Sequence, residues 1–235
     1  MMIRIGNFLF TYRNWLFPLA IALVLLDQPS AMANEGLAVT IGFALALLGQ
    51  SLRAITIGLA YIKRGGKNKK VYAKTLVQEG VFAHCRNPLY LGNFLMLLGL
   101  GFIANSWWFL IVGMPFFLFA YAAIVLAEEN FLRNKFGAEF DDYCRRVPRI
   151  IPNLAGFGST WREMEFHWRR LIVKEHNSTF GWLVIAIVVL MQDRWDITQD
   201  LTEPGMYAFA AALVLLTLGY ATVRVLKKNR MLVAD

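Results

Sequence analysis

The sequence predicts an all-α integral membrane protein with about six transmembrane helices and a cytoplasmic-side region of short helices. Of its 235 residues, 57% are hydrophobic and 17% are charged, whereas a soluble domain is near half apolar and a quarter charged. Several apolar runs also approach the roughly 20 residues that a spanning helix needs. The net charge of +8 fits loops that collect Lys and Arg at one membrane face, so it does not by itself indicate nucleic-acid binding.

The apolar runs define the expected helices in order. The first run lacks a convincing small-residue cleavage site after it, so it is interpreted as a transmembrane helix and not as a signal peptide. Two cysteines are too few for a disulfide framework. The six candidate spans are residues 9–26, 36–62, 89–104, 106–127, 178–192 and 206–226.

The orientation follows from the loops. Basic residues collect in the loop 63–88 and in the tail 224–230, whereas the segments 27–35 and 192–205 are mainly acidic. All basic segments lie on one side if both termini are cytoplasmic, and this requires the short fifth run to span. The expected location is a bacterial inner membrane, or the endoplasmic reticulum membrane in a eukaryotic source.

Four regions are expected along the chain. They are a helix pair with a basic loop, a core containing a helical hairpin, an amphipathic interfacial segment and a C-terminal helix pair, at 1–75, 76–152, 153–177 and 178–235. Within the core, 128–152 reads as two short helices, because Gly137 is placed to end one and Pro148 the other. Residues 160–172 show helical apolar spacing and indicate a helix in the headgroup layer, or alternatively an ordinary helix packed on the cytoplasmic face.

One polar cluster precedes the third span. Pro88 after Asn87 forces an extended or turn conformation and then allows a helix from Leu89. Such a helix start offers backbone N–H groups and a positive dipole end, where a carboxylate can dock. The alternative is a plain junction between loop and helix. His84 in this cluster is a possible base, although a lone loop histidine is more often a surface or packing residue.

A second polar cluster follows the fourth span. Adjacent carboxylates at a hydrocarbon boundary, Glu128 and Glu129, are costly without partners, for which Arg86, Arg146 and Arg53 are candidates. A solvated helix end is the alternative. The arginines at 145, 146 and 149 suit carboxylate or phosphate binding, although headgroup contacts explain some of them. Arg53 lies inside the second span, where it faces a partner or cavity, or else snorkels.

Taken in order, residues 76–152 resemble the catalytic half of the isoprenylcysteine carboxyl methyltransferase family and the related membrane phospholipid methyltransferases. The matching positions are Gly80, Arg86, Pro88, Tyr90 and Gly92, then Glu128 and Glu129, then Phe136, Gly137, Tyr143, Arg146, Val147, Pro148 and Pro152. Asn87 stands where the family usually has His, so no imidazole at that position takes part in the chemistry. Phe82 and Phe140 each replace a Tyr. The last two helices lie outside the resemblance.

The resemblance implies S-adenosyl-L-methionine as cofactor and a membrane lipid or lipid-linked substrate that enters from the bilayer. It predicts a cofactor site of Gly80, His84, Arg86, Asn87, Pro88, Tyr90, Leu91, Gly92, Glu128, Glu129 and Tyr143. It also implies that Arg146 orients the methyl acceptor. Arg146, Glu129 and Glu128 are thus the candidate catalytic residues. Arg53, Arg146 and Arg149 are the candidate substrate contacts, with Arg53 and Arg149 chosen from their positions in the sequence. No metal and no nucleic acid are expected, and the oligomeric state stays open.

Four functions remain open on the sequence. The first is O-methylation of a lipid-linked carboxylate, which is already ionised at neutral pH and needs no general base. The second is N-methylation of a phospholipid amine, which must lose a proton first, so that Glu128 or Glu129 acts as base. The third is an NADPH-dependent membrane reductase, and the fourth is a non-enzymatic membrane protein such as a transporter or scaffold.

Overall fold

The computed structural model describes residues 1–26, 29–60, 64–67, 70–73 and 75–234. The α-helices are α1 (Met2–Ile21), α2 (Glu35–Leu59), α3 (Pro88–Ile103), α4 (Met114–Phe136), α5 (Ala138–Arg146), α6 (Phe157–Glu163), α7 (Trp168–Thr198) and α8 (Pro204–Lys228). Single turns of other helix types are η1 (Ala22–Leu25), η2 (Gly80–Ala83) and the π-helical η3 (Phe109–Gly113). The predicted all-α class is confirmed.

One small sheet lies where the sequence predicted a basic loop. Strands β1 (Arg64–Lys67) and β2 (Lys70–Ala73) pair antiparallel, with Arg64 opposite Ala73. Lys135 on α4 donates to the carbonyl of Ala73, which fastens this hairpin to the core.

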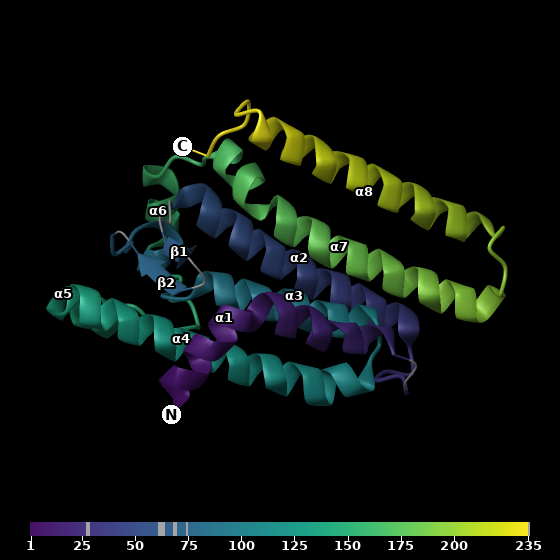
Figure 1. Cartoon of the computed structure of the whole chain (residues 1–235), viewed down its shortest axis with the longest axis horizontal. Coiled ribbons are helices and arrows are strands. Elements are labelled where there is room, and N and C mark those ends of the chain that lie inside the picture. The colour runs from purple at the N-terminus through teal and green to yellow at the C-terminus, as the bar shows by residue number, and fades with distance from the viewer. Residues whose placement is uncertain (27–28, 61–63, 68–69, 74, 235) are drawn as a thin grey trace.

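The long helices lie side by side, and the short elements gather at one end. Figure 1 shows β1, β2, α5, α6 and both chain termini together at that end, which we call the polar end of the bundle. The turns that join α1 to α2 and α7 to α8 lie at the other end. The shared location of both termini agrees with the arrangement deduced from the basic loops.

Among the residues that the structure describes, four helical stretches are long and apolar enough to cross a membrane: 2–25, 35–59, 109–136 and 204–228. The chain is therefore an integral membrane protein. The apolar α3 has 16 residues, fewer than the roughly 20 that a perpendicular span needs. With 31 residues, α7 is longer than any other helix described, but its ends are polar. Length and composition thus do not confirm the expected number of six spans.

The contact between α2 and α3 is the most extensive helix pairing in the described chain. It depends on small residues: a Cβ atom placed on Gly99 would lie 2.5 Å from the carbonyl oxygen of Gly42, and one on Gly49 would lie 2.5 Å from that of Gly92. Small residues let helix backbones approach closely, which favours association inside a membrane. This close pairing fixes α3, and therefore its N-terminal end, against α2.

Helix α1 packs along α4 through aromatic side chains. Phe17 lies edge-on to Phe117, with 5.3 Å between ring centroids, and to Tyr121, with 5.6 Å. Such edge-to-face pairs add to the free energy gained by burial. The two closely packed pairs, α1–α4 and α2–α3, form the walls around the cavities described below.

Two expected helices differ from the structure. The segment 128–152 is not two separate short helices, because α4 continues unbroken to Phe136 before Gly137, at φ +53°, ends it. Only the second short helix, α5, is separate. The prediction of one amphipathic helix over residues 160–172 is also wrong. The segment is interrupted at 164–167, so that its first half belongs to α6 and its second half starts α7.

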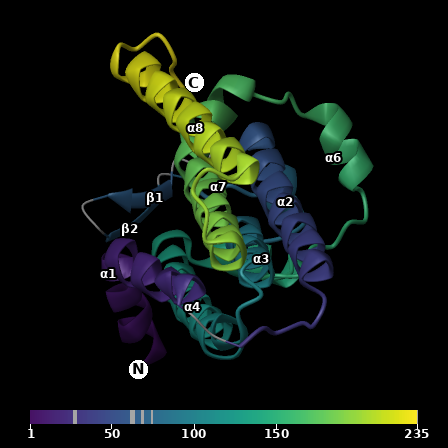
Figure 2. The ribbon, with the colours of Figure 1, turned by 90° about the vertical axis from the view of Figure 1, so that its right-hand side faces the viewer.

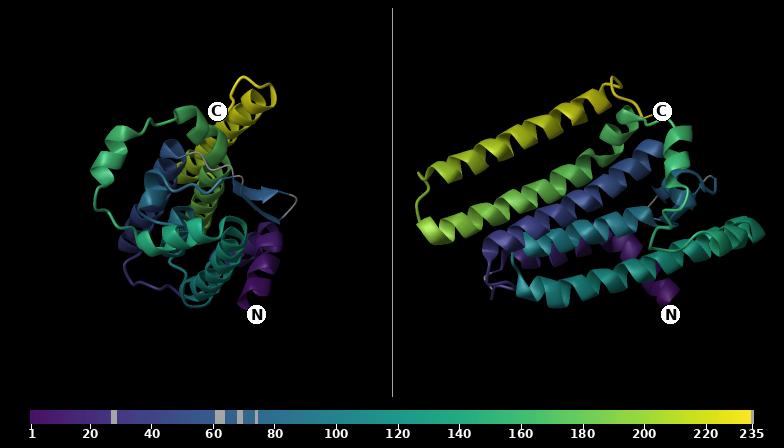
Figure 3. Two further views of the ribbon diagram at one scale, coloured as in Figure 1. Left: turned by 90° about the vertical axis from the view of Figure 1, so that its left-hand side faces the viewer. Right: turned by 180° about the vertical axis from the view of Figure 1, so that it is seen from behind.

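Between α5 and α7 the chain forms an arch, residues 147–167, that carries α6 away from the bundle (Figures 2 and 3). His84 holds it: Nδ1 donates to the carbonyl of Asn153 at 2.7 Å, and Nε2 pairs with the hydroxyl of Thr160 at 2.9 Å. At its end, the N–H of His167 donates to the carbonyl of Gly58 on α2.

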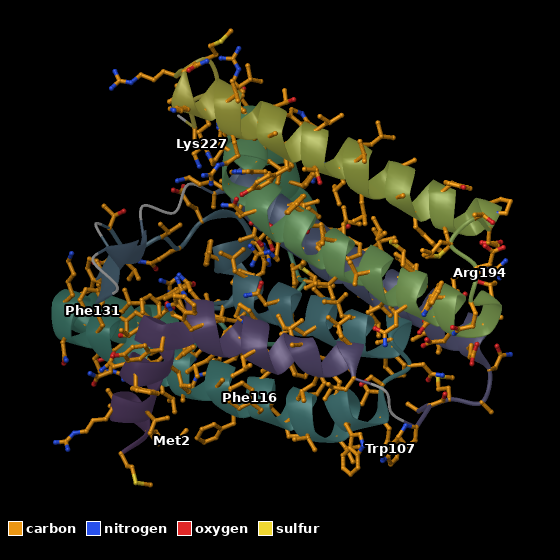
Figure 4. All side chains as sticks on the ribbon, turned by 45° about the vertical axis from the view of Figure 1, so that its right-hand side comes forward. Met2, Trp107, Phe116, Phe131, Arg194 and Lys227 are labelled. Carbon is orange, nitrogen blue, oxygen red and sulfur yellow. The ribbon has the colours of Figure 1, made fainter. Side chains whose placement is uncertain are left out.

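Helix α8 packs on α7 and leaves most of its surface exposed. Figure 4 shows mainly carbon along this hairpin between the ends marked by Arg194 and Lys227. Exposed large apolar side chains such as Leu215 and Leu218 are suited to lipid contact.

We predict that Gly99→Ala destabilises the protein by about 1–3 kcal/mol, because the added methyl group forces α2 and α3 apart. Thermal unfolding in detergent measures the effect. Gly219→Ala on α8 is the matched control, since a Cβ there meets no described atom within 4 Å. An equal loss in both variants would contradict the packing argument.

Candidate active site

The two polar clusters meet at the start of α3. The N–H of Arg86 donates to the carbonyl of Pro148 at 2.9 Å, and the side-chain amide of Asn87 donates to that of Arg149 at 3.1 Å. Asn87 occupies the N-cap position and Pro88 the first turn of α3. The helix therefore begins one residue before Leu89, the start that the sequence predicted. The two clusters therefore lie on the same side of the helical hairpin formed by α3 and α4.

Glu129 is the centre of an arginine brace. Its carboxylate accepts two hydrogen bonds from Arg149, at 3.1 and 2.8 Å, and lies 3.5 Å from the guanidinium of Arg86. The residue is only 5% exposed. A buried carboxylate needs such charged partners, and the bidentate guanidinium fixes its geometry. The brace ties α4 to the segments before α3 and after α5.

Its neighbour Glu128 has different surroundings. The hydroxyl of Tyr90 donates to its carboxylate at 2.9 Å, and both side chains line a cavity. Successive helical residues are rotated by about 100°, so adjacent glutamates on α4 face different environments. Glu129 belongs to the brace, and Glu128 faces the cavity.

This cavity, which we call the polar cavity, has a volume of about 710 Å³ and lies between α1, α2, α3, α4 and α7. Four residues predicted for the site line it: Arg53, Asn87, Tyr90 and Glu128. Its other polar lining residues were not predicted, and they are Arg13, Asn14, Asn93, Arg170, Lys174 and Ser178. The spacing of 170, 174 and 178 on one helical face is the signal that would have indicated the last three.

Arg53 is held by a partner that the sequence did not indicate. Its Nε and Nη2 atoms donate to the two oxygens of Glu175 on α7, at 2.9 and 2.5 Å, and Nη1 donates to Asn93 at 2.5 Å. Gln50 donates to Glu175 at 3.4 Å and accepts from Trp182 at 3.1 Å. This network joins α2, α3 and α7 and fixes Arg53 at the wall of the polar cavity.

A second, largely apolar cavity of about 510 Å³ adjoins the first. Asn93 and Tyr121 line both cavities. Its remaining lining is mainly aliphatic, with Met96, Leu97 and Leu100 from α3. The two cavities together have a polar end and an apolar end, which matches the distribution of polarity along an amphiphile.

Several predicted site residues support the site without lining the polar cavity. Gly80, at φ +62°, turns the chain beside Ala60, and Gly92 packs on the stem of Arg53. The hydroxyl of Tyr143 donates to the carbonyl of Phe82 at 2.7 Å. Both ring nitrogens of His84 are engaged with the arch. Leu91 follows in the first turns of α3.

Arg146 lies on the exposed surface, where its guanidinium donates to Gln78 at 2.9 Å. It is not among the described residues that line the polar cavity. Its expected role in orienting the acceptor therefore stays a prediction. Arg149, three residues later, is the arginine that contacts Glu129.

The two cysteines are free and do not form a disulfide with each other. Burial raises the pKa of the Cys85 thiol to about 11, so it stays protonated at neutral pH. Cys144 accepts a hydrogen bond from Arg86. Within the described ranges, no group of three or more His, Cys, Asp or Glu side chains is arranged to hold a metal ion.

Comparison with known proteins agrees with this architecture. The sequence model of the phospholipid methyltransferase family matches residues 37–139, which include α2, α3, α4 and the glutamate pair. The cobalt-zinc-cadmium resistance protein CzcN of Cupriavidus metallidurans is 32% identical over 159 residues, covering 66% of this chain and 68% of the relative. No solved structure matches the chain.

Two further relatives match over shorter stretches. The nickel-cobalt-cadmium resistance protein NccN of Alcaligenes xylosoxydans xylosoxydans is 38% identical over 84 residues, 36% of this chain and 39% of the relative. The protein-S-isoprenylcysteine O-methyltransferase of Schizosaccharomyces pombe is 31% identical over 114 residues, 45% of each chain. The chain belongs to the phospholipid methyltransferase family, together with the isoprenylcysteine carboxyl methyltransferases, and is a membrane methyltransferase.

We predict that Glu175→Gln lowers the free energy of unfolding by about 3–5 kcal/mol, because it leaves the Arg53 charge buried without its counterion. Thermal unfolding checks this. Asp141→Asn is the matched control, since it removes an exposed partner of Arg133 and costs about 0–1 kcal/mol. The double variant Arg53→Met, Glu175→Leu should regain much of the loss. If the single variant is as stable as the control, the pair does not hold α7.

Proposed function

We propose that the protein transfers a methyl group from S-adenosyl-L-methionine to a lipid-linked carboxylate at the polar end of the bundle. The observation that carries this proposal is the joined pair of cavities, with Glu128, Tyr90 and the start of α3 at one end and aliphatic residues at the other. A water-soluble donor fits the first part and a lipid chain fits the second. The similarity to an isoprenylcysteine O-methyltransferase supports the carboxylate.

The residues of the polar cavity fit the donor. Its positively charged sulfonium is favoured beside aromatic faces, and the rings of Tyr90 and Tyr121 lie 5.4 Å apart at the cavity wall. Glu128 is an acceptor for amino or hydroxyl groups. The N-terminal end of α3, at Asn87 and Pro88, suits the donor's carboxylate.

When bound, the donor supplies an electrophilic methyl group. The chain's own contribution is alignment and exclusion of water: the α2–α3 and α1–α4 pairs enclose the reactants, and the arginine brace holds α4 in position. A carboxylate acceptor is ionised at neutral pH, so its oxygen attacks without a general base. Glu128 then binds the donor and does not move a proton.

A second candidate is N-methylation of a phospholipid amine. The observation that favours it is the position of Glu128 in the cavity, where it is placed to accept the proton that an ammonium group must lose before attack. In both candidates, the polar end faces the cytoplasm, because the basic segments gather there, and a bacterial source places it in the inner membrane.

We predict that S-adenosylhomocysteine raises the thermal midpoint of the purified protein and that NADPH does not, because a ligand that binds the folded state stabilises it. Glu128→Gln should weaken this binding by about tenfold, since it removes a charged acceptor. Glu139→Gln, on the exposed α5, is the control and should bind normally. Stabilisation by NADPH alone would favour the membrane reductase, and no stabilisation by either would favour a non-enzymatic protein.

We further predict that Arg149→Lys lowers methyl transfer to a lipid extract by about 100-fold, because loss of the fork on Glu129 shifts α4 and the reactants. Transfer of a labelled methyl group, followed by mass spectrometry of the lipids, measures it. Arg146→Lys is the comparison variant. A large loss in Arg146→Lys with normal activity in Arg149→Lys would instead support the acceptor role predicted for Arg146 from the sequence.

A further inference from the structure

One face of α7 runs along both cavities. Arg170, Lys174 and Ser178 line the polar cavity, and the same face continues through Gly181, Trp182 and Ile185 along the apolar one. These positions recur at helical spacing and change from cationic to apolar along the helix. From 170 to 185 the face extends for about 22 Å, at ~1.5 Å per residue. All of α7 lies beyond residue 139, where the match to the family model ends.

The cationic end of this face begins in the first turn of α7. Arg170 lies there, is only 6% exposed, and has no acidic residue beside it in that turn. The helix dipole disfavours a cation at this end of a helix. The positive charge is therefore placed at the cavity in spite of the helix dipole and not because of it.

The charges around the polar cavity are unequal. Four described cationic residues line it: Arg13, Arg53, Arg170 and Lys174. Glu128 is the acidic residue among the described lining residues. Glu175, which is not among them, forms an ion pair with Arg53. Arg13 on α1 also lines the cavity, with its guanidinium 4.2 Å from the ring centre of Phe10. The side of the cavity formed by α1 and α7 therefore favours an anion, whereas the side with Glu128 and Tyr90 suits the cationic donor.

We propose that α7 selects the methyl acceptor: Arg170 and Lys174, with Arg13, bind an anionic carboxylate or phosphate headgroup, and the acceptor's chain lies along the apolar cavity. This inference rests on the proposed function, because it concerns the acceptor end of the same site. Arginine and lysine are suited to both anions, and a protonated amine headgroup is repelled. Acceptor selection thus resides in a helix outside the matched core.

Three amphiphiles with the same chain test the headgroup: dodecyl phosphate, dodecanoate and dodecylamine. Each is added below its micellar concentration to the full-length protein in an uncharged maltoside detergent, and binding is measured by the shift of the thermal midpoint. We expect the two anions to stabilise the protein and the amine not to. The stronger of the two anions identifies whether phosphate or carboxylate is preferred.

Variants on α7 locate the binding. Lys174→Gln should weaken binding of the preferred anion by about tenfold, and Arg170→Gln by at least as much. Arg169→Gln is the matched control, because residue 169 is adjacent, exposed and not among the described residues lining either cavity. Since Lys174 is exposed, its variant remains informative even if loss of the buried Arg170 prevents folding.

Equal stabilisation by dodecylamine, or an equal loss of anion binding in Arg169→Gln and Lys174→Gln, would overturn the proposal. S-adenosylhomocysteine separates it from the proposed function. If the nucleoside stabilises the wild-type protein and Lys174→Gln does not affect binding of either anion, the headgroup site fails and the methyltransferase site stands. If the anions bind through Lys174 and the nucleoside does not bind, the headgroup site stands and the methyltransferase site fails.

Discussion

The ion pair between Arg53 and Glu175 is the interaction on which the arrangement of the C-terminal half depends. Both side chains are largely buried, at 12% and 4% exposure, and neither charge is tolerable there without the other. Asn93, Gln50 and the adjoining Trp182 satisfy further polar atoms of the network. Because α8 packs on α7, this pair positions the C-terminal hairpin together with the apolar packing of Trp182, Ala186 and Val189 in the core.

The need to pair a buried charge also explains the surroundings of the second buried carboxylate, that of Glu129. Glu129 is acceptable within the protein because two arginines, from segments before α3 and after α5, converge on it. The brace contacts the chain just before α3, through Arg86, and the Arg53 pair contacts α3 at Asn93. Together they hold α2, α4 and α7 around the start of that helix, so that electrostatic pairing and the glycine contacts of α2 and α3 define one site.

The relatives that match this chain carry names that indicate different roles. Two are named for metal resistance and one for isoprenylcysteine O-methylation, and the family match covers residues 37–139. In our proposals, that shared part binds the donor through Tyr90 and Glu128, whereas α7 adds the contacts to the acceptor. Such a division lets one methyl-transfer core serve acceptors with different headgroups.

The sequence by itself determined the membrane class and, to within one residue, the start of α3 at Asn87-Pro88, because apolar length and proline geometry are local properties. It did not indicate Glu175 as the partner of Arg53, which lies 122 positions away. It also did not separate the roles of Glu128 and Glu129, or distinguish Arg149 from the exposed Arg146. Those assignments depend on how the helices are rotated and packed against one another, so only the tertiary structure decided them. The physical reason is that a buried charge needs a partner of opposite charge, and packing determines which side chain is close enough to be that partner.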